Sequence, residues 1–484
     1  MNIVQRIARN TAVLLISQVI SYLLAFFYTM YTARYLGPAG FGILSFGLAF
    51  TGIFAVFGDL GLQPLTVREV ARNKSLAPKY LVNMSLMKIF LVSVTFGLIC
   101  FTINLLGYSE TTIKVVYLLG LYIVLQAYIQ MFYSIFQAYE RMEYQSLGQI
   151  LNAFLILSGV LVAIKCGFRV ITFAALFPLA SMVVLGYNFV VLKGKFFDLF
   201  SAWSSQKIKI DWSFWKSTIK EALPFGLTGI FVTIYYWIDT VMLSLMKGNE
   251  VVGWYNAAYR IVLVLSVIRG IIHTSIFPIM SVFFKDSKES LKLICEKLFK
   301  YGIIIALPIA VVTTMLARRI ILLIYGTEYF PSVIALQILV WSNVIIFVNF
   351  AHRLFETTNR QNLVAKITML GAMTNIFLNT LLIPSFSYIG AAIATCITEV
   401  IVLFIGLALF LKTEYKFSGL SILRNISKVT IAGVIMGYCI KCFYNLNLII
   451  LILISALIYI MLLYLMKIFD DTDIYIVKSL VKGG

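Results

Sequence analysis

The feature that most constrains this chain is a long series of apolar runs, each about 20 residues long, with short polar segments between them. A helix of about 20 residues crosses the roughly 30 Å hydrocarbon core of a bilayer. The runs lack the polar and apolar alternation of barrel strands. Hydrophobic residues make up 61% of the chain and charged residues 12%. The sequence therefore predicts an all-α integral membrane protein, because a helix satisfies its backbone hydrogen bonds inside lipid.

We expect 14 transmembrane helices, which places both termini on one side of the membrane. The predicted spans are 11–33, 41–65, 80–106, 113–137, 145–166, 170–192, 218–246, 251–283, 293–316, 331–352, 362–384, 388–411, 424–443 and 447–467. On this topology 28 of the 39 Lys and Arg residues lie on the side of the termini and 8 lie on the other. The positive-inside rule then predicts cytoplasmic termini. We expect a multi-pass protein of the cytoplasmic (inner) cell membrane. The concentration of Lys and Arg on one side of the membrane explains the formal charge of +19, so no nucleic acid partner is expected.

The chain repeats itself across its longest connection. The stretch GPAGFGILSFGLAF (37–50), around the second span, corresponds at an offset of 211 to GNEVVGWYNAAYRI (248–261), around the eighth. Two glycine pairs match in this alignment: Gly37 with Gly248, and Gly42 with Gly253. A second echo pairs FQAYER (136–141) with FETTNR (355–360). Six spans separate the copies, so the two halves have the same orientation and form a parallel repeat.

This repeat sets the expected domains. They are an N-terminal lobe of six helices (1–192), a cytoplasmic amphipathic linker (193–217), a C-terminal lobe of six helices (218–411), and two additional spans with a cytoplasmic tail (412–484). The linker carries several tryptophans and lysines, which is typical of a segment lying on the inner leaflet.

Three stretches resemble one known family. TARYLGPAGFGILSF (32–46), FGDLGLQPLTVREVAR (57–72) and FQAYERM (136–142) are similar to the polysaccharide biosynthesis or O-antigen-type flippases of the multidrug/oligosaccharidyl-lipid/polysaccharide exporter superfamily. The resemblance implies two six-helix lobes that close over a central cavity, open inward and outward in turn. The sugar-pyrophosphate head of a polyprenyl carrier would cross that cavity while its lipid tail stays in the bilayer. It also implies a monomer that works beside the glycosyltransferases and polymerase of its pathway.

One apolar run, residues 251–280, carries three basic side chains inside the membrane. A cation in a bilayer costs at least a few kcal/mol, so it faces a partner or a wet cavity. Arg269 and His273 are four residues apart and share one helix face, whereas Arg260 points the opposite way. We expect Arg269 and His273 to bind a phosphate, with Arg260 and Arg34 as further cavity cations. For Arg34, snorkelling at the outer interface is the alternative.

A second hypothesis concerns Asp59. At the offset of 211 it corresponds to Gly270, next to Arg269, so Asp59 and Arg269 would lie at similar depths. The pair would form when the inner mouth closes, and opening would free the guanidinium, whose fork suits phosphate. In the alternative, Arg269 and His273 only reach the inner interface, and Asp59 caps or packs within its own lobe.

Four polar residues of the second half fall at similar depths: Asp239, Asn375, Asn379 and Thr395. Their hard oxygens could hold Na⁺, and the arrangement resembles the sodium site of lipid II flippases, although an acid at Asn379 would bind more strongly. Alternatively, Arg260 pairs with Asp239 and removes the need for an ion. Glu399 is either a proton carrier or a packed, protonated acid. Beyond such Na⁺ or H⁺ coupling, no cofactor is expected.

Three function classes make different demands on such a chain. A flippase for anionic lipid-linked glycans fits the intramembrane cations. A cation-coupled drug or toxin extruder of the same superfamily would need an acidic cavity. A membrane-embedded polymerase or ligase would need a sizeable catalytic loop, whereas the predicted loops are short and the chain has two histidines, His273 and His352. The sequence therefore predicts a transporter and no enzyme.

Overall fold

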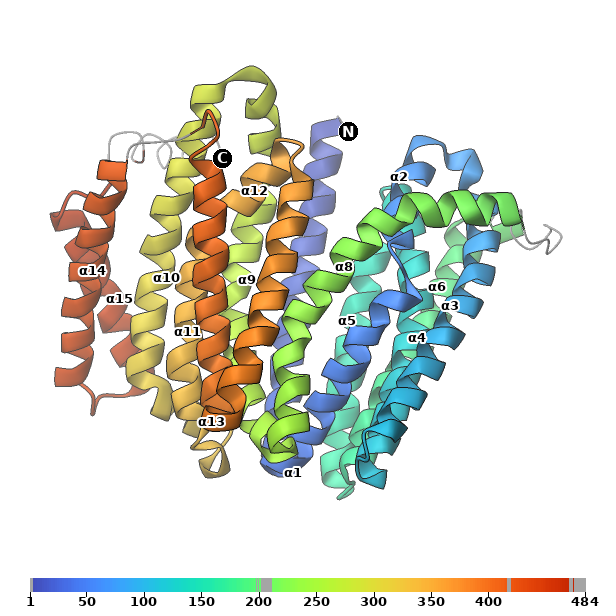
Figure 1. The fold of residues 1–484 in the computed structure, drawn as a ribbon, viewed down its shortest axis with the longest axis horizontal. Coiled ribbons are helices and arrows are strands. Elements are labelled where there is room, and N and C mark those ends of the chain that lie inside the picture. Colours follow the sequence, from blue (N-terminus) through green and yellow to red (C-terminus); the bar gives the residue numbers. More distant parts are fainter. Residues whose placement is uncertain are drawn as a thin grey trace. The chain divides into compact units, whose positions relative to one another are not determined.

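The computed structural model describes residues 3–196, 198, 200–201, 211–415, 419–469 and 473, and it contains helices and no strand in these ranges (Figure 1). The main helices are α1 (Ile3–Ala55), α2 (Leu62–Arg72), α3 (Ala77–Leu105), α4 (Glu110–Ala138), α5 (Met142–Lys165), α6 (Val170–Lys195), α8 (Trp212–Lys247), α9 (Asn249–Asp286), α10 (Lys288–Ile324), α11 (Ser332–Val348), α12 (Ala351–Thr357), α13 (Gln361–Phe410), α14 (Gly419–Cys442) and α15 (Leu448–Leu465). The predicted linker 193–217 lies partly outside the described residues.

Among the described residues, eleven helices are long and apolar enough to cross a membrane. Two of them contain a break: α1 at Gly37 (φ 67°, ψ 177°) and α13 at Ser387 (φ 53°, ψ −136°). Each break lies between two predicted spans. The chain is thus a multi-pass membrane protein, while the count of fourteen and the side of the termini stay predictions.

The chain forms two compact units. The first consists of Met1–Asn256 and Ala372–Tyr388, and the second of Ala257–Gly371 and Ile389–Gly484. α8 and the first turns of α9 belong to the first unit, so the division does not fall at the predicted linker. The lobes 1–192 and 218–411 stay a prediction.

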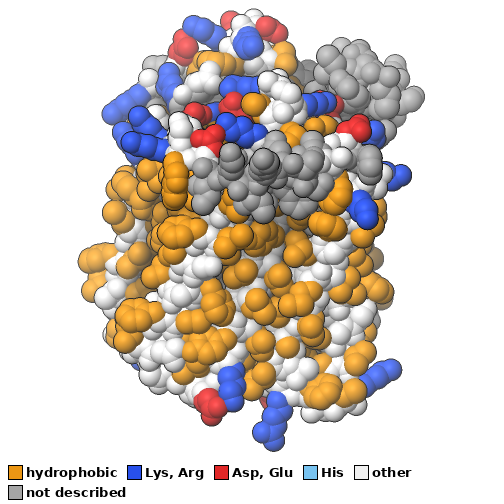
Figure 2. Space-filling model, turned by 90° about the vertical axis from the view of Figure 1, so that its right-hand side faces the viewer, with side chains coloured by type: hydrophobic (Ala, Val, Ile, Leu, Met, Phe, Trp, Pro, Cys, Tyr) orange, Lys and Arg blue, Asp and Glu red, His pale blue; other side chains and the backbone are white. Residues whose placement is uncertain are grey.

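The first unit presents an apolar outer face. Figure 2 shows the face on the side of α3, α4 and α6, with hydrophobic side chains over its middle and Lys and Arg toward its two ends. Large apolar side chains such as Phe90, Phe101 and Val190 are more than 60% exposed. Such exposure suits a surface in contact with lipid, with the charges at the level of the headgroups.

Both sequence echoes recur as the same local geometry. Gly37 and Gly248 adopt nearly the same left-handed conformation, with φ, ψ of 67°, 177° and 87°, 175°. In the other echo, the amide of Arg141 donates to the carbonyl of Phe136, and the amide of Arg360 donates to that of Phe355, both at 2.8 Å. Each turn ends a helix with a 6→1 hydrogen bond.

The second pair of matched glycines, Gly42 and Gly253, lies where α1 and α9 approach each other closely. A Cβ added at Gly42 would overlap the carbonyl oxygen of Asn249, and one added at Gly253 would overlap that of Pro38. Glycine at both positions lets α1 and the start of α9 cross with their backbones in contact.

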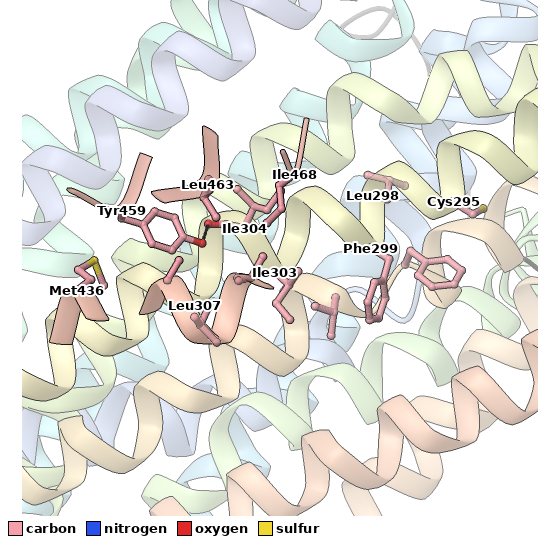
Figure 3. Close-up of a cluster of buried hydrophobic side chains, with 14 of the residues drawn as sticks. Cys295, Leu298, Phe299, Ile303, Ile304, Leu307, Met436, Tyr459, Leu463 and Ile468 are labelled. Carbon is pink, nitrogen blue, oxygen red and sulfur yellow. Dashed lines mark hydrogen bonds between the residues drawn. The ribbon is translucent and has the colours of Figure 1, made fainter. Parts of the chain in front are cut away.

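In the second unit, α14 and α15 pack against α10. Their shared core contains buried residues from all three helices (Figure 3): Cys295, Leu298, Phe299, Ile303, Ile304, Leu307, Met436, Tyr459 and Leu463, together with Ile468 beyond α15. The hydroxyl of Tyr459 donates to the carbonyl of Ile304 at 2.9 Å. Helices α14 and α15, which cover the two predicted additional spans, therefore contribute to the second unit's core.

Candidate anion site and neighbouring polar clusters

A cavity of about 180 Å³ lies within the second unit between α9, α10 and α11. It is lined by Arg269, Ile272, His273, Ile276, Ile294, Lys297, Leu298, Tyr301, Gly302 and Phe347. Arg269 and His273 are one helical turn apart on α9 and both line this cavity. They therefore lie on one face of the helix, as their spacing predicts. Two further polar side chains, from Lys297 and Tyr301, come from α10.

The guanidinium of Arg269 is incompletely satisfied. Its Nε is buried and has no hydrogen-bond partner among the described residues. Burying such a donor without an acceptor is unfavourable, and an anion in the cavity would supply one. His273 is buried one turn away. The arrangement can therefore bind an anionic group such as a phosphate.

Two basic residues of this cluster were not predicted. His352 and Arg353, at the start of the short helix α12, act electrostatically on Arg269 or His273. Two of their side-chain nitrogens, Nε2 of His352 and Nε of Arg353, are buried without a hydrogen-bond partner in the described part of the chain. Arg353 also pairs with Glu356 at 2.8 Å and lies 5.3 Å from the ring centroid of Phe277. The sequence feature that could have identified them is a pair of adjacent basic residues at the end of an apolar run.

Glu399 belongs to the same cluster. It is buried on α13, in the second unit, and its carboxylate is among the charged groups that act on Arg269. Since Glu356 acts on Arg269 as well, the cluster contains both bases and acids. The surroundings of Arg269 therefore contain negative as well as positive side chains.

Asp473, near the C-terminus, contacts two of the residues that line this cavity. Asp473 accepts hydrogen bonds from Lys297 and Lys300, both at 2.5 Å, and from the hydroxyl of Tyr301 at 2.7 Å. Lys297 and Tyr301 also line the cavity. The Asp473 carboxylate is buried and so compensates basic side chains at the edge of the anion site.

Asp59 lies in the first unit, in the turn between α1 and α2. Its Oδ1 accepts from the ammonium of Lys88 at 2.8 Å, and its Oδ2 accepts from the backbone amide of Gln63 at 3.2 Å. Lys88, on α3, is buried. The carboxylate thus has a cation and a helix start within its own unit, which favours the alternative weighed for Asp59. The pairing with Arg269 stays a prediction.

Three of the four residues predicted to hold Na⁺ come together in the first unit. Asp239, on α8, accepts from the hydroxyl of Tyr255 at 2.7 Å and from Nδ2 of Asn379 at 2.5 Å. Asn379 also donates to Oδ1 of Asn375 at 3.0 Å. The buried Oδ1 of Asn379 has no partner among the described residues. Thr395 belongs to the second unit, where its hydroxyl donates to Ala391.

The remaining predicted cations are placed separately. Arg260 lies on α9 in the second unit, and its buried Nε has no partner within the described ranges. Arg34 lies in α1 near the break at Gly37 and is exposed. A pair of Asp239 with Arg260, and a cavity role for Arg34, remain predictions.

The fold is that of a known class of membrane transporters. The structure superposes on the lipid II flippase MurJ, in a structure described as an inward closed conformation, with a TM-score of 0.73 and 17% identity. The match covers 92% of this chain and 97% of MurJ. The model of the "polysaccharide biosynthesis protein" family matches residues 7–284, more than half of the chain. The chain belongs to that family, as the resemblance implied. A second family model, MatE, matches residues 224–381.

Two archaeal relatives are similar in sequence. An uncharacterized membrane protein of Methanocaldococcus jannaschii is 28% identical over 227 residues, which are 45% of this chain and 43% of the relative. The probable low-salt glycan biosynthesis flippase Agl15 of Haloferax volcanii is 22% identical over 447 residues, which are 89% of this chain and 90% of the relative. The first match thus spans less than half of that relative, whereas the second spans nearly all of both chains.

Proposed function

We propose that this protein is a flippase that moves a polyprenyl-pyrophosphate-linked oligosaccharide from the cytoplasmic to the outer leaflet, for cell-surface polysaccharide synthesis. The observation that carries the proposal is the half-buried Arg269, whose buried Nε is unsatisfied, on the wall of a cavity shared with His273. Membership of the polysaccharide biosynthesis family and a near full-length relative named as a glycan flippase support it. The protein would act as a transporter in the inner membrane, as a monomer, and not as an enzyme.

The pyrophosphate would bind at Arg269 and His273. A guanidinium presents several N–H donors in a fixed fork and holds a phosphate at two oxygens. Arg353 adds positive charge, and the acids Glu356 and Glu399 limit the net charge so that the headgroup can also leave. Transport is then a population shift between inward-open and outward-open states, in which the headgroup binds one state better.

In the gate hypothesis, Asp59 competes with the headgroup for Arg269. Lys88 already bonds Asp59, so gate closure would exchange or share this partner. We expect Asp59→Asn and Arg269→Gln to lower export by amounts that do not add when the two are combined, because each removes the same interaction. Additive losses would contradict a gate pair and favour separate roles.

Na⁺ is the proposed coupling ion, and H⁺ is its alternative. The carboxylate of Asp239 and the amide oxygens of Asn375 and Asn379 are hard ligands that suit Na⁺, and the unsatisfied Oδ1 of Asn379 fits such a role. The hydroxyl of Thr395 would be the fourth ligand. Bound Na⁺ would supply positive charge beside the carboxylate of Asp239. If H⁺ is the coupling ion instead, Glu399 would carry it.

A drug or toxin extruder is the second candidate, since the MatE model matches residues 224–381. Both candidates are tested in a deletion strain that expresses the full chain. We expect wild-type protein to restore surface glycan and Arg269→Gln to lower it at least tenfold, with lipid-linked glycan accumulating in the inner leaflet.

Arg318→Gln is the matched control, because it makes the same change at an exposed arginine of the second unit. It should export normally. If Arg269→Gln exports as well as the control does, the flippase proposal fails. If the strain instead regains resistance to cationic dyes without any change in glycan, the extruder is correct.

A further inference from the structure

A second cavity, of about 490 Å³, lies within the first unit and contains none of the residues considered so far. Its residues come from one face of α1, one face of α5, and single positions of α4 and α6: Leu14, Gln18, Ser21, Tyr22, Ala25, Tyr28, Tyr122, Gln145, Gln149, Asn152, Ala153, Ile156 and Phe177. Its volume falls in the range of about 300–1,000 Å³ that small-molecule sites occupy.

The lining is polar but uncharged. Four amides face the cavity, from Gln18, Gln145, Gln149 and Asn152, and not one of its thirteen lining residues is Asp, Glu, Lys, Arg or His. Amides both donate and accept hydrogen bonds, which suits ligands whose groups do the same. A phosphate would find no cation here, so this cavity and the anion site at Arg269 suit different parts of a ligand.

Some of the lining polar atoms lack partners. The Oγ of Ser21 and the Oδ1 of Asn152 are buried without a hydrogen bond among the described residues. Others are held in place: Gln18 donates to the hydroxyl of Tyr22 at 3.2 Å, and Gln145 accepts from Gln137 at 2.8 Å. Buried polar atoms without partners mark a place where a ligand or water supplies them. A hydrocarbon chain would leave them unsatisfied.

Part of the cavity lining is aromatic. Phe177 lies between Tyr28 and Tyr122, with ring centroids 6.2 Å and 5.5 Å away in edge-to-face geometry. Edge contacts leave parts of the ring faces available to another apolar surface. A sugar ring combines the two properties that this cavity offers, since it has an apolar C–H face and a rim of hydroxyls that donate and accept.

We infer that this cavity binds one or two neutral sugar rings of the transported glycan. The amides of Gln149 and Asn152 would contact the sugar hydroxyls, and the Tyr28, Tyr122 and Phe177 cluster would contact its apolar face. This inference rests on the proposed flippase function and adds to it a sugar subsite in a different unit from the phosphate site. It also makes α1 and α5 the elements that select the glycan.

The test measures two ligands separately on purified full-length protein in detergent. The probes are the oligosaccharide released by mild acid from the host's lipid-linked pool, and inorganic pyrophosphate. We expect Asn152→Leu, with or without Gln149→Leu, to weaken oligosaccharide binding at least tenfold and to leave pyrophosphate binding unchanged. Arg269→Gln should do the reverse. Asn104→Leu, the same change at an exposed amide on α3, should alter neither.

The outcomes separate the subsite from the function. Wild-type affinity for the oligosaccharide in Asn152→Leu and in the double variant would overturn the sugar subsite, even where export still depends on Arg269. If wild-type protein binds neither probe and the deletion strain exports glycan normally, the proposed function fails with it. A variant that elutes aggregated is replaced by Asn152→Asp, which keeps the volume but changes hydrogen bonding and should shift affinity among glycans.

Discussion

The ammonium of Lys88 donates to the carboxylate of Asp59 at 2.8 Å, which joins α3 to the turn after α1. The lysine side chain is 1% exposed and the aspartate side chain 28%. A buried ammonium in a membrane protein needs such a partner. This pair therefore fixes the position of Asp59 within its unit.

Removing one partner should destabilise the protein more than removing both. We expect Lys88→Met and Asp59→Asn each to cost on the order of 2 kcal/mol, because each leaves a poorly compensated polar group. The double variant should recover part of that loss. Melting temperatures in detergent measure this cycle, and a double variant that loses the sum of both single effects would show that the pair is not energetically coupled.

Gly42 and Gly253 should not tolerate a methyl group. Ala at either position would push a Cβ into a backbone carbonyl of the crossing helix, so we expect lower melting temperatures and reduced yield of monodisperse protein. Gly97→Ala is the control, since nothing lies within 4 Å of its added Cβ. It should be neutral or slightly stabilising, because Ala favours helix. Equal behaviour of all three variants would rule out the close crossing.

Na⁺ should stabilise the protein through Asp239. At a concentration ten times its Kd, a bound ion adds about 1.4 kcal/mol, so the melting temperature should be higher in NaCl than in KCl of the same strength. Asp239→Asn should abolish the difference. Asp286→Asn, at an exposed position of α9, should preserve it. Equal melting temperatures of the wild type in both salts would exclude a Na⁺ site of useful affinity.

Asp473 should weaken anion binding at the adjacent cavity. Its carboxylate neutralises Lys297 and Lys300, so Asp473→Asn should tighten pyrophosphate binding about 3- to 10-fold, which corresponds to about 0.7–1.4 kcal/mol. The same change should lower the melting temperature, because two buried ammonium groups lose a charged partner. Unchanged affinity would mean that the lysines do not act on the ligand.

Asp211 makes the start of α8 sensitive to acid. Hydrogen bonding from the backbone amide of Phe214, and then from the side chain of Lys79, lowers the pKa of Asp211 below its ordinary value. A lowered pKa means that the stabilisation is present above the unfolded-state pKa and is lost as pH falls through the folded-state pKa. Melting temperatures of wild type and Asp211→Ala should therefore differ near neutral pH and converge in acid.

Asp211→Asn separates the two causes of this effect. Its side-chain oxygen can still cap the helix, whereas the charge that attracts Lys79 is lost. We expect the melting temperature of Asp211→Asn at neutral pH to lie between those of the wild type and Asp211→Ala. A difference between wild type and Asp211→Ala that grows as the pH is lowered would contradict the assignment.

Periodicity and repeats predicted much of this fold. Helical spacing placed Arg269 and His273 on one face, and the offset of 211 identified Gly37 and Gly248, whose backbones share one unusual conformation. Such features can be predicted because they depend on the spacing of residues along one helix or on identical residues in the two halves of a sequence repeat. Depth counting also grouped Asp239 with Asn375 and Asn379, which bond in the structure.

Contacts between distant helices could not be predicted in the same way. Lys88 and Asp59 are 29 residues apart on different helices, so no helical period relates them. His352 and Arg353 end an apolar run, where basic residues ordinarily mark an interface. Only the packing of α12 reveals that they act on Arg269. The uncharged cavity between α1 and α5 was missed because scattered amides give no local signal.

The turns after Phe136 and Phe355 have the same backbone hydrogen bond but little common sequence. Of their six letters only the first and the last agree, yet the backbone makes the same hydrogen bond in each. A turn held by backbone atoms alone leaves its side chains free to vary, and a hydrogen bond of the same kind also ends α5 and α15.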